Sequence, residues 1–260
     1  MIFIDTHTHL YLEEFKDDRA EVLSKAIEAG VKYLLLPNID VDSLALVLQM
    51  TKEYPSNCFP MIALHPTDVK ENYKYQIKQM EEALLHHKFI AIGETGIDLY
   101  WDKTFFKQQC ESLEIHCEWA LKHHLPLVVH SRESHKEIMD VLALYKGKGL
   151  TGVFHCFSGD YSQAKEVLDF GFYLGIGGTV TYKKSLLPEV VEKVGLNYIL
   201  LETDAPFLSP VPMRGKRNES SNIPIIAQKI ATLLNVPLEA VALITTQNAN
   251  NLFKLNIDEF

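Results

Sequence analysis

Short apolar runs alternate along the chain with longer segments in which apolar residues recur every three to four positions. The short runs are mostly apolar at every position, as expected of parallel strands that are buried on both faces. The longer segments have the period of helices with one apolar face. Strands are predicted at residues 2–6, 33–36, 59–64, 89–93, 127–130, 152–154, 172–176 and 198–201.

Each predicted strand is followed by a segment of helical length. These helices are predicted at residues 17–29, 43–54, 74–86, 105–124, 134–144, 162–170, 185–193 and 223–234. Gly30, Gly171 and Gly195 follow three of them, which is a typical position for glycine at a helix end. Eight strand–helix units in 260 residues predict an α/β fold of the closed (β/α)8 barrel type.

The remaining segments add a terminal helix and one long loop. The tail from Pro237 onward predicts a further helix that covers part of the barrel. No shift in composition indicates a linker, so residues 1–260 are predicted to form a single domain. The longest irregular stretch, residues 205–222, contains several prolines and a basic cluster. A loop of this length in a compact domain is usually a functional lid or a binding loop.

Composition places the chain among ordinary globular proteins, with 47% hydrophobic and 23% charged residues. The formal net charge of −9 provides no general attraction for nucleic acid, so a polyanionic substrate would need local positive charge or bound metal ions. No apolar run approaches the roughly 20 residues that span a bilayer, and no basic segment precedes the first run, so we expect a cytoplasmic protein without membrane contact. The four scattered cysteines are expected to be reduced.

Histidine and acidic residues gather at the carboxyl ends of five predicted strands, where the active sites of barrel enzymes lie. His7 and His9 follow the first strand at alternate positions, so their side chains point the same way. The other candidates are Glu94, His130, His155 and Asp204. One histidine at a strand end is usually a hydrogen-bonded core residue, but buried ligand-type residues at five strand ends are costly without a shared partner. The set therefore predicts a metal centre.

Six ligand groups exceed what one catalytic Zn²⁺ needs, and they suit two divalent ions. We expect Glu94 to bridge the ions, with the histidine pair of the first strand on one ion and His130 and His155 on the other. Asp204 is predicted to bind the first ion and to accept the proton of a nucleophilic water. Metal coordination lowers the pKa of water from 15.7 toward ~7, so the predicted reaction is hydrolysis.

Seven sequence motifs carry a family resemblance that runs almost from end to end. They are DTHTHL at 5–10, LHP at 64–66, IGETGID at 92–98, LPLVVHSR at 125–132, HCFSG at 155–159, GGTVTYK at 177–183 and LETDAP at 201–206. On these motifs the sequence resembles the TatD family of metal-dependent deoxyribonucleases, a branch of the barrel amidohydrolase superfamily. The resemblance implies the same six ligands, and a 3′→5′ exonuclease or related nuclease activity on DNA that divalent cations support.

The sequence also differs from the family's pattern in places. Ala63 stands where a glycine commonly precedes the His-Pro pair, Ser220 where a proline often follows Asn-Glu, and Asn251 where an arginine is usual. None of these differences removes a ligand, so they bear on substrate preference more than on reaction type. A glutamate at position 94 resembles this family rather than the relatives that use a carbamylated lysine.

Three residues near the predicted ligands have two interpretations each. His65 either hydrogen-bonds a phosphate or a leaving oxygen, or is a structural histidine. Glu202, at the end of the last strand, is expected to orient a ligand histidine or a water rather than to bind metal. Arg132 presents a guanidinium fork that suits a phosphate, or it forms an ion pair with Glu133 or Glu137.

Two further groups are candidates for substrate contact. Asp98, Tyr100 and Trp101 are predicted to form the loop after the fourth strand, where the rings either stack on a nucleobase or pack against the protein. Arg214 and Arg217, in the long loop, provide the best local positive charge on an acidic protein. We expect them to contact phosphate, the alternative being a solvated loop.

Two other functions remain alternatives. The same pair of ions would polarise the carbonyl of a small cyclic amide or an aminoacyl ester, and a barrel with structural metals would be a non-catalytic interaction module. An open groove with Arg132 and Arg217 exposed favours a polymer, whereas a closed apolar pocket favours a small molecule.

Four histidines favour Zn²⁺ or Mn²⁺, while the resemblance implies that Mg²⁺ supports activity. We expect a monomer without an obligate protein partner.

Overall fold

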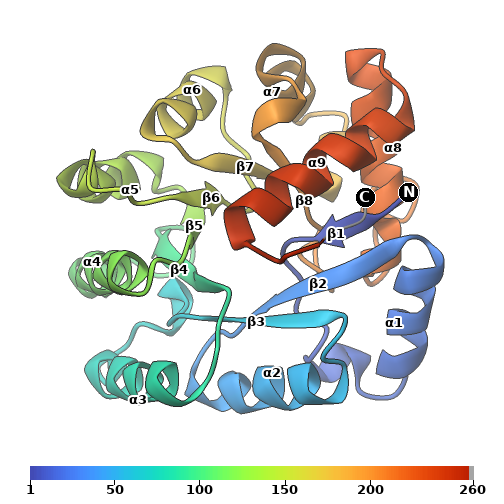
Figure 1. Ribbon diagram of the computed structural model, residues 1–260. Coiled ribbons are helices and arrows are strands. Elements are labelled where there is room, and N and C mark those ends of the chain that lie inside the picture. The colour runs from blue at the N-terminus through green and yellow to red at the C-terminus, as the bar shows by residue number, and fades with distance from the viewer. Residues whose placement is uncertain (258–260) are drawn as a thin grey trace.

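The computed structural model describes residues 1–257, in which eight parallel strands form one sheet in sequence order. The strands are β1 Phe3–Asp5, β2 Val31–Pro37, β3 Cys58–Ile62, β4 Ala91–Asp98, β5 Leu127–Arg132, β6 Gly152–Phe154, β7 Tyr173–Ile176 and β8 Ile199–Leu201. The first and last strands meet, because the backbone N–H of Thr6 donates to the carbonyl of Leu201 at 3.0 Å. The sheet is a barrel, and the predicted fold is confirmed (Figure 1). The predicted domain boundary at residue 260 lies outside the described residues.

Helices alternate with the strands and surround the barrel (Figure 1). They are α1 Arg19–Glu28, α2 Val41–Glu53, α3 Tyr73–His86, α4 Phe106–His123, α5 His135–Leu142, α6 Tyr161–Phe170, α7 Leu187–Val194 and α8 Ile223–Leu234. Local capping sets several of their ends. The carboxylate of Asp40 accepts from the backbone N–H of Ser43 at the start of α2, and that of Asp160 accepts from Gln163 at the start of α6. The predicted helices are present, with bounds shifted by a few residues.

The terminal helix α9, Leu238–Phe253, lies across one end of the barrel (Figure 1). Seven strands each contribute a buried side chain to one apolar cluster with this helix. The cluster contains Ile4, Leu35, Met61, Ala91, Val128, Val153 and Leu200 from the barrel, and Ala249, Leu252, Phe253 and Ile257 from the terminal segment. The predicted covering helix is therefore present, and it fills the end at which the strands begin. The opposite end of the barrel, where the strands have their carboxyl ends, is not covered by α9.

Strand β4 differs from the prediction in a way that matters for the site. The sequence predicted a strand over 89–93, but β4 runs from Ala91 to Asp98 and is buried throughout. The apolar pattern stops at Glu94, since the second half of the strand carries Glu94 and Asp98 beside His130, and Thr95 beside His116 of α4. Glu94 is thus held within a strand rather than in the loop after it.

Among the described residues, no single helix is both long and apolar enough to cross a membrane. The segments Ser220–Leu234 and Leu238–Phe253 reach that threshold only together, as a pair bent by 111°. The second segment is α9 and the first contains α8, and these helices contact each other, β1 and β8.

Candidate metal centre

All six predicted ligands meet at the mouth of the barrel, at the end opposite α9. They come from five different strand ends: His7 and His9 after β1, Glu94 in β4, His130 in β5, His155 after β6 and Asp204 after β8. Four are buried, and His130 and Asp204 are partly exposed. The expected convergence of imidazoles and carboxylates on one centre is present.

The two carboxylate oxygens of Glu94 divide the histidines into two sets. Oε2 lies 3.0 Å from Nε2 of His7 and 3.7 Å from Nε2 of His9. Oε1 lies 2.7 Å from Nδ1 of His130 and 2.8 Å from Nε2 of His155. One carboxylate therefore faces two groups of nitrogen atoms, which is the arrangement that a bridge between two cations requires.

Asp204 completes the set on the side of His9. Its Oδ1 lies 3.5 Å from Nε2 of His9 and 3.9 Å from Nε2 of His7. The backbone at Asp204 has a φ of 56°, a left-handed conformation that aspartate tolerates better than most residues. The side chain keeps 15% of its surface exposed, so this carboxylate is accessible from the open mouth.

Burial and neighbouring charges set the protonation of this cluster. Burial raises the pKa of Glu94, but the charges of the surrounding imidazoles, led by His155, hold that pKa well below its usual range. Burial lowers the pKa of His155, but the charges of Glu94 and Glu202 raise it well above the usual range. Hydrogen bonds to carboxylates likewise outweigh burial and raise the pKa of His130. Burial and the charge of His155 lower the pKa of His7.

This donor set fits divalent cations. Metal ligands are neutral imidazoles and ionised carboxylates, so cations bound here would replace any protons on the histidines around Glu94. His7 already has a lowered pKa, which favours a neutral donor. Three groups have ligand atoms that all lie within 4.8 Å of one another: His7 with His155 and Asp204, His7 with His9 and Glu94, and His65 with Glu94 and His130.

Glu202 lies behind His155, as expected for a residue that orients a ligand. Its Oε1 accepts from the backbone N–H of Cys156 and lies 3.5 Å from Nδ1 of His155. The carboxylate fits there because Gly175 has no side chain. A Cβ at Gly175 would lie 2.3 Å from Oε2 of Glu202. Glu202 therefore lies near Nδ1 of His155, while Nε2 of the same ring faces Glu94.

Two further residues contact ligand histidines. Tyr11 was not predicted to do so, and Asp98 was predicted to lie in a loop. Tyr11 is within hydrogen-bond distance of His9, with its hydroxyl 2.9 Å from Nδ1. Asp98 was expected in a loop, but it is the last residue of β4, and its Oδ2 lies 2.9 Å from Nε2 of His130. For Asp98 the alternation of side chains along a strand was the available signal, since it follows Glu94 by four residues within β4. Tyr11 lies in a turn after His9, where alternation gives no such signal.

His65 lies beside the centre. Its Nε2 is 3.2 Å from Oε1 of Glu94, and its Nδ1 is 2.6 Å from Oγ1 of Thr67. The ring therefore has one nitrogen toward the cluster and one toward its own loop. This position is compatible with the expected contact to a phosphate or a leaving oxygen.

Arg132 packs against aromatic rings and not against the acidic residues that were one of its two expected environments. The centre of its guanidinium lies 3.9 Å from the centroid of the Tyr100 ring and 5.2 Å from that of Trp101. Within residues 1–257, it forms no ion pair with Glu133 or Glu137. Arg132 therefore stacks on the aromatic loop that follows β4, and its charge lies at the rim of the mouth.

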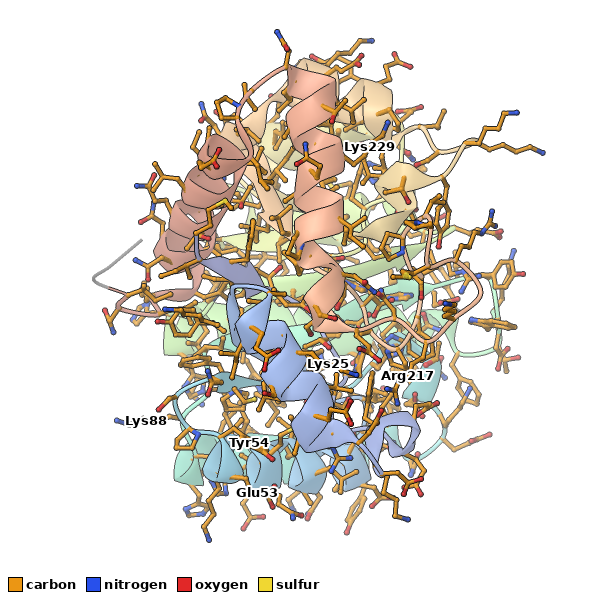
Figure 2. The ribbon with its side chains drawn as sticks, turned by 90° about the vertical axis from the view of Figure 1, so that its right-hand side faces the viewer. Lys25, Glu53, Tyr54, Lys88, Arg217 and Lys229 are labelled. Atoms are coloured by element: carbon orange, nitrogen blue, oxygen red, sulfur yellow. The ribbon has the colours of Figure 1, made fainter. Side chains whose placement is uncertain are left out.

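The long loop is fixed to the rest of the protein by Arg217, which was expected to contact phosphate. Its guanidinium donates to both carboxylate oxygens of Asp18, at 2.9 and 2.6 Å, and to Glu219 at 2.9 Å. Figure 2 shows Arg217 beside α1, which Asp18 precedes. Acidic groups therefore already engage the terminal nitrogens of Arg217, and a phosphate would have to displace them. Arg214 lies over the ring of Tyr182 at 4.6 Å and remains exposed.

A cavity of about 390 Å³ lies next to His155, between the loops that follow β5 and β6. Its lining is mixed: Phe154 and Phe157 are apolar, whereas Ser131 and Gln163 are polar. This cavity is therefore neither purely apolar nor purely basic.

The sequence matches the family described as TatD related DNase over residues 4–254. The chain belongs to the TatD family. One TatD relative, the uncharacterized metal-dependent hydrolase YabD of Bacillus subtilis, is 35% identical over 257 residues, which cover 98% of this chain and 100% of YabD. Together with the clustered His, Glu and Asp residues, this membership makes the chain a metal-dependent hydrolase.

Solved structures agree with the TatD assignment. The crystal structure of YjjV, a TatD homolog from Escherichia coli K12, superimposes with a TM-score of 0.91 at 30% identity, covering 97% of this chain and 98% of YjjV. The phosphotriesterase homology protein from Escherichia coli has a TM-score of 0.69 at 14% identity, covering 96% and 98% of the two chains. The second likeness shows a shared barrel fold only.

Proposed function

We propose that this TatD-family hydrolase is a deoxyribonuclease that cleaves DNA phosphodiester bonds from the 3′ end and uses two divalent cations. The observation that carries the proposal is the division of nitrogen atoms between the two oxygens of Glu94. His7, His9 and Asp204 would hold one cation, His130 and His155 would hold the other, and Glu94 would be shared between them. Imidazole ligands favour Zn²⁺ or Mn²⁺, and the carboxylates also suit Mg²⁺.

When bound, two divalent cations supply a nucleophile at neutral pH and neutralise charge on the attacking and leaving oxygens. The protein's own residues accept the proton and bind the phosphate. Asp204 is the proposed acceptor of the proton of the attacking water. Burial raises the pKa of Asp204, but the hydrogen bond from His9 and the charges of nearby imidazoles outweigh burial and lower it, which favours the ionised form that can accept a proton. His65, whose Nε2 lies 3.2 Å from Oε1 of Glu94, is the proposed donor of a hydrogen bond to a phosphate oxygen.

Two features support DNA as the substrate. The matching family is described as a DNase family. In addition, positive charge is found at the rim, with Arg132 stacked on Tyr100 and Arg214 over Tyr182. An acidic protein with a net charge of −9 binds a polyanion only through such local charge and through bound cations.

The test is a cleavage assay with DNA labelled at the 5′ or the 3′ end. Single-stranded, duplex and nicked DNA are supplied in turn with Mg²⁺, Mn²⁺ and Zn²⁺, beside Glu94→Gln, Asp204→Asn and the control Glu239→Gln. Glu239 is exposed at the start of α9, at the far end of the barrel. We expect a ladder from the 3′ end that both site variants slow by at least about 100-fold and that the control leaves unchanged.

Absence of cleavage with every metal, or equal cleavage by the site variants, would contradict the proposal. In that case the metal centre would be assayed on small cyclic amides and aminoacyl esters. Release of product from one of these, with loss in the Glu94 and Asp204 variants, would assign the site to carbonyl hydrolysis instead.

A further inference from the structure

Two large aromatic side chains lie exposed at the rim of the mouth, in the loop between β4 and α4. Trp101 keeps 68% of its surface exposed and Tyr100 keeps 50%. Their rings meet edge to face, with centroids 4.9 Å apart. The guanidinium of Arg132 stacks on Tyr100 at 3.9 Å. These three residues, Tyr100, Trp101 and Arg132, form what we call the rim platform.

The rim platform is preformed. One oxygen of Asp98, Oδ1, accepts hydrogen bonds from the backbone N–H groups of Tyr100 at 3.0 Å and Trp101 at 3.2 Å. The backbone N–H of Leu99 also donates to the carbonyl of Arg132 at 3.0 Å, which ties the loop to β5. Carboxylate contacts of this kind fix a turn, so the rings need little ordering when a ligand arrives.

The same carboxylate connects the rim platform to the metal centre. The second oxygen of Asp98 lies 2.9 Å from Nε2 of His130, whose Nδ1 lies 2.7 Å from Glu94. Asp98 itself is buried. The position of the aromatic loop is thus set relative to the reacting centre by a single buried side chain.

An exposed ring next to a stacked guanidinium suits a flat ligand that carries negative charge. The face of Trp101 offers a stacking surface, and Arg132 offers a charge and hydrogen-bond donors that are not engaged by an acidic partner within residues 1–257. A nucleobase with its phosphate has both properties, and stacking accepts any base because each has a π face. Inside a duplex the neighbouring pairs cover both faces of a base, and a terminal pair exposes one face only, so an unpaired base reaches a protein ring most freely.

We propose that the rim platform binds an unpaired nucleobase of the DNA strand that the metal centre cleaves, and that Asp98 is the positioning residue that holds it there. This inference rests on the proposed function but can be tested apart from it. It makes the rim platform a determinant of preference for single strands over duplex ends. Trp101 contributes the stacking surface and Arg132 contacts the adjoining phosphate.

Intrinsic fluorescence provides a direct test, because the chain has two tryptophans and only one is exposed. Trp119 is 4% exposed and provides a constant background. The EDTA-treated protein is titrated with a single-stranded oligothymidylate and with the matching duplex, and affinity is measured separately by anisotropy of the labelled strand. We expect the single strand, and not the duplex, to quench the Trp101 emission.

Variants separate stacking from folding. We expect Trp101→Ala to weaken single-strand affinity by roughly 10-fold or more, Arg132→Ala to weaken it, and Trp101→Phe to preserve most of it. Asp98→Ala should weaken binding although Asp98 does not touch the base, whereas Asp98→Asn, which keeps an acceptor for the two N–H groups, should restore it. Tyr75→Ala, which removes another exposed ring on α3, is the matched control and should have no effect.

Three results would overturn the inference. The first is cleavage of DNA by the metal-loaded enzyme with no quenching and no effect of Trp101→Ala on affinity, which would leave the proposed function intact. The second is equal binding of duplex and single strand through Trp101. The third is a fluorescence change that depends on protein concentration alone, with a dimer in sedimentation that Trp101→Ala abolishes, because the rim platform would then be a self-association surface.

Discussion

Oε1 of Glu94 lies 2.7 Å from Nδ1 of His130, across two neighbouring strands of the barrel. The pairing of β4 with β5 places Gly96 opposite His130. Gly96 has a φ of 147°, and a Cβ there would lie 2.0 Å from the carbonyl oxygen of His130. The close approach of the two backbones at this glycine therefore brings the carboxylate and the imidazole together before any cation binds.

Gly175 makes room for Glu202 in a similar way, and this can be tested with an alanine. Gly175→Ala would place a Cβ 2.3 Å from Oε2 of Glu202 and 3.1 Å from Cα of His155. We expect a loss of about 1–3 kcal/mol in the free energy of unfolding, together with weaker metal binding, because Glu202 must move away from His155. Urea denaturation and metal titration measure the two effects.

Gly177 provides the matched control for this substitution. A Cβ at Gly177 would meet its nearest neighbour at 3.6 Å, which is an ordinary contact. Gly177→Ala should therefore change stability and metal affinity little. Equal effects of the two alanines would show that Glu202 does not depend on the space at Gly175.

His116 predicts how the stability of the fold depends on pH. This buried imidazole accepts from the backbone N–H of Leu64 and lies 3.0 Å from Oγ1 of Thr95, and burial lowers its pKa to about 3. In the unfolded chain its pKa is near 6.5, so below that value only the unfolded state gains a proton. The contribution of His116 to stability is complete above about pH 6.5 and falls by up to ~1.4 kcal/mol per unit as the pH drops toward 3.

Comparison with His116→Gln isolates this contribution from that of the metal-centre histidines. We expect the loss of unfolding free energy between pH 7 and pH 5 to be about 2 kcal/mol smaller in His116→Gln than in the unaltered protein. Urea denaturation at the two pH values measures it. The same pH dependence in both proteins would show that His116 is protonated in the folded state.

Arg217 is predicted to act on stability and not on substrate. Arg217→Ala removes donors to Asp18 and Glu219, and we expect the free energy of unfolding to fall by about 1 kcal/mol, as for a partly exposed ion pair. Cleavage of DNA at saturating metal should change by less than about 3-fold. Arg214→Ala, in the same loop, should leave stability within about 0.5 kcal/mol. A large loss of cleavage in Arg217→Ala with unchanged stability would instead indicate that Arg217 contacts phosphate.

The sequence predicted the barrel and the convergence of the six candidate ligands for one physical reason. Parallel strands all end at the same face, so residues that follow apolar runs, such as His130 and His155, must meet there once the barrel closes. The apolar terminal segment similarly predicted a cover for the other end, which α9 provides. These inferences need only the local pattern and the rules of barrel topology.

The directions of long side chains could not be predicted in this way. Arg217 finds its partner Asp18 at a separation of 199 residues, and no local pattern encodes that contact. Arg132 stacks on the loop after the neighbouring strand, which depends on the pairing of β4 with β5. Asp98 was misplaced because polar residues inside β4 look like the start of a loop. Each of these depends on tertiary contacts that only the folded chain defines.

The number of cations per chain tests the central claim most directly. Protein treated with EDTA and desalted is titrated with Mn²⁺ in a calorimeter, and bound metal is counted by elemental analysis, for the unaltered chain, Glu94→Gln and the control Glu239→Gln. Two ions per chain in the unaltered protein and the control, and fewer than two in Glu94→Gln, are the predicted result. A single ion in the unaltered protein, or two ions retained at full affinity in Glu94→Gln, would contradict a centre bridged by Glu94.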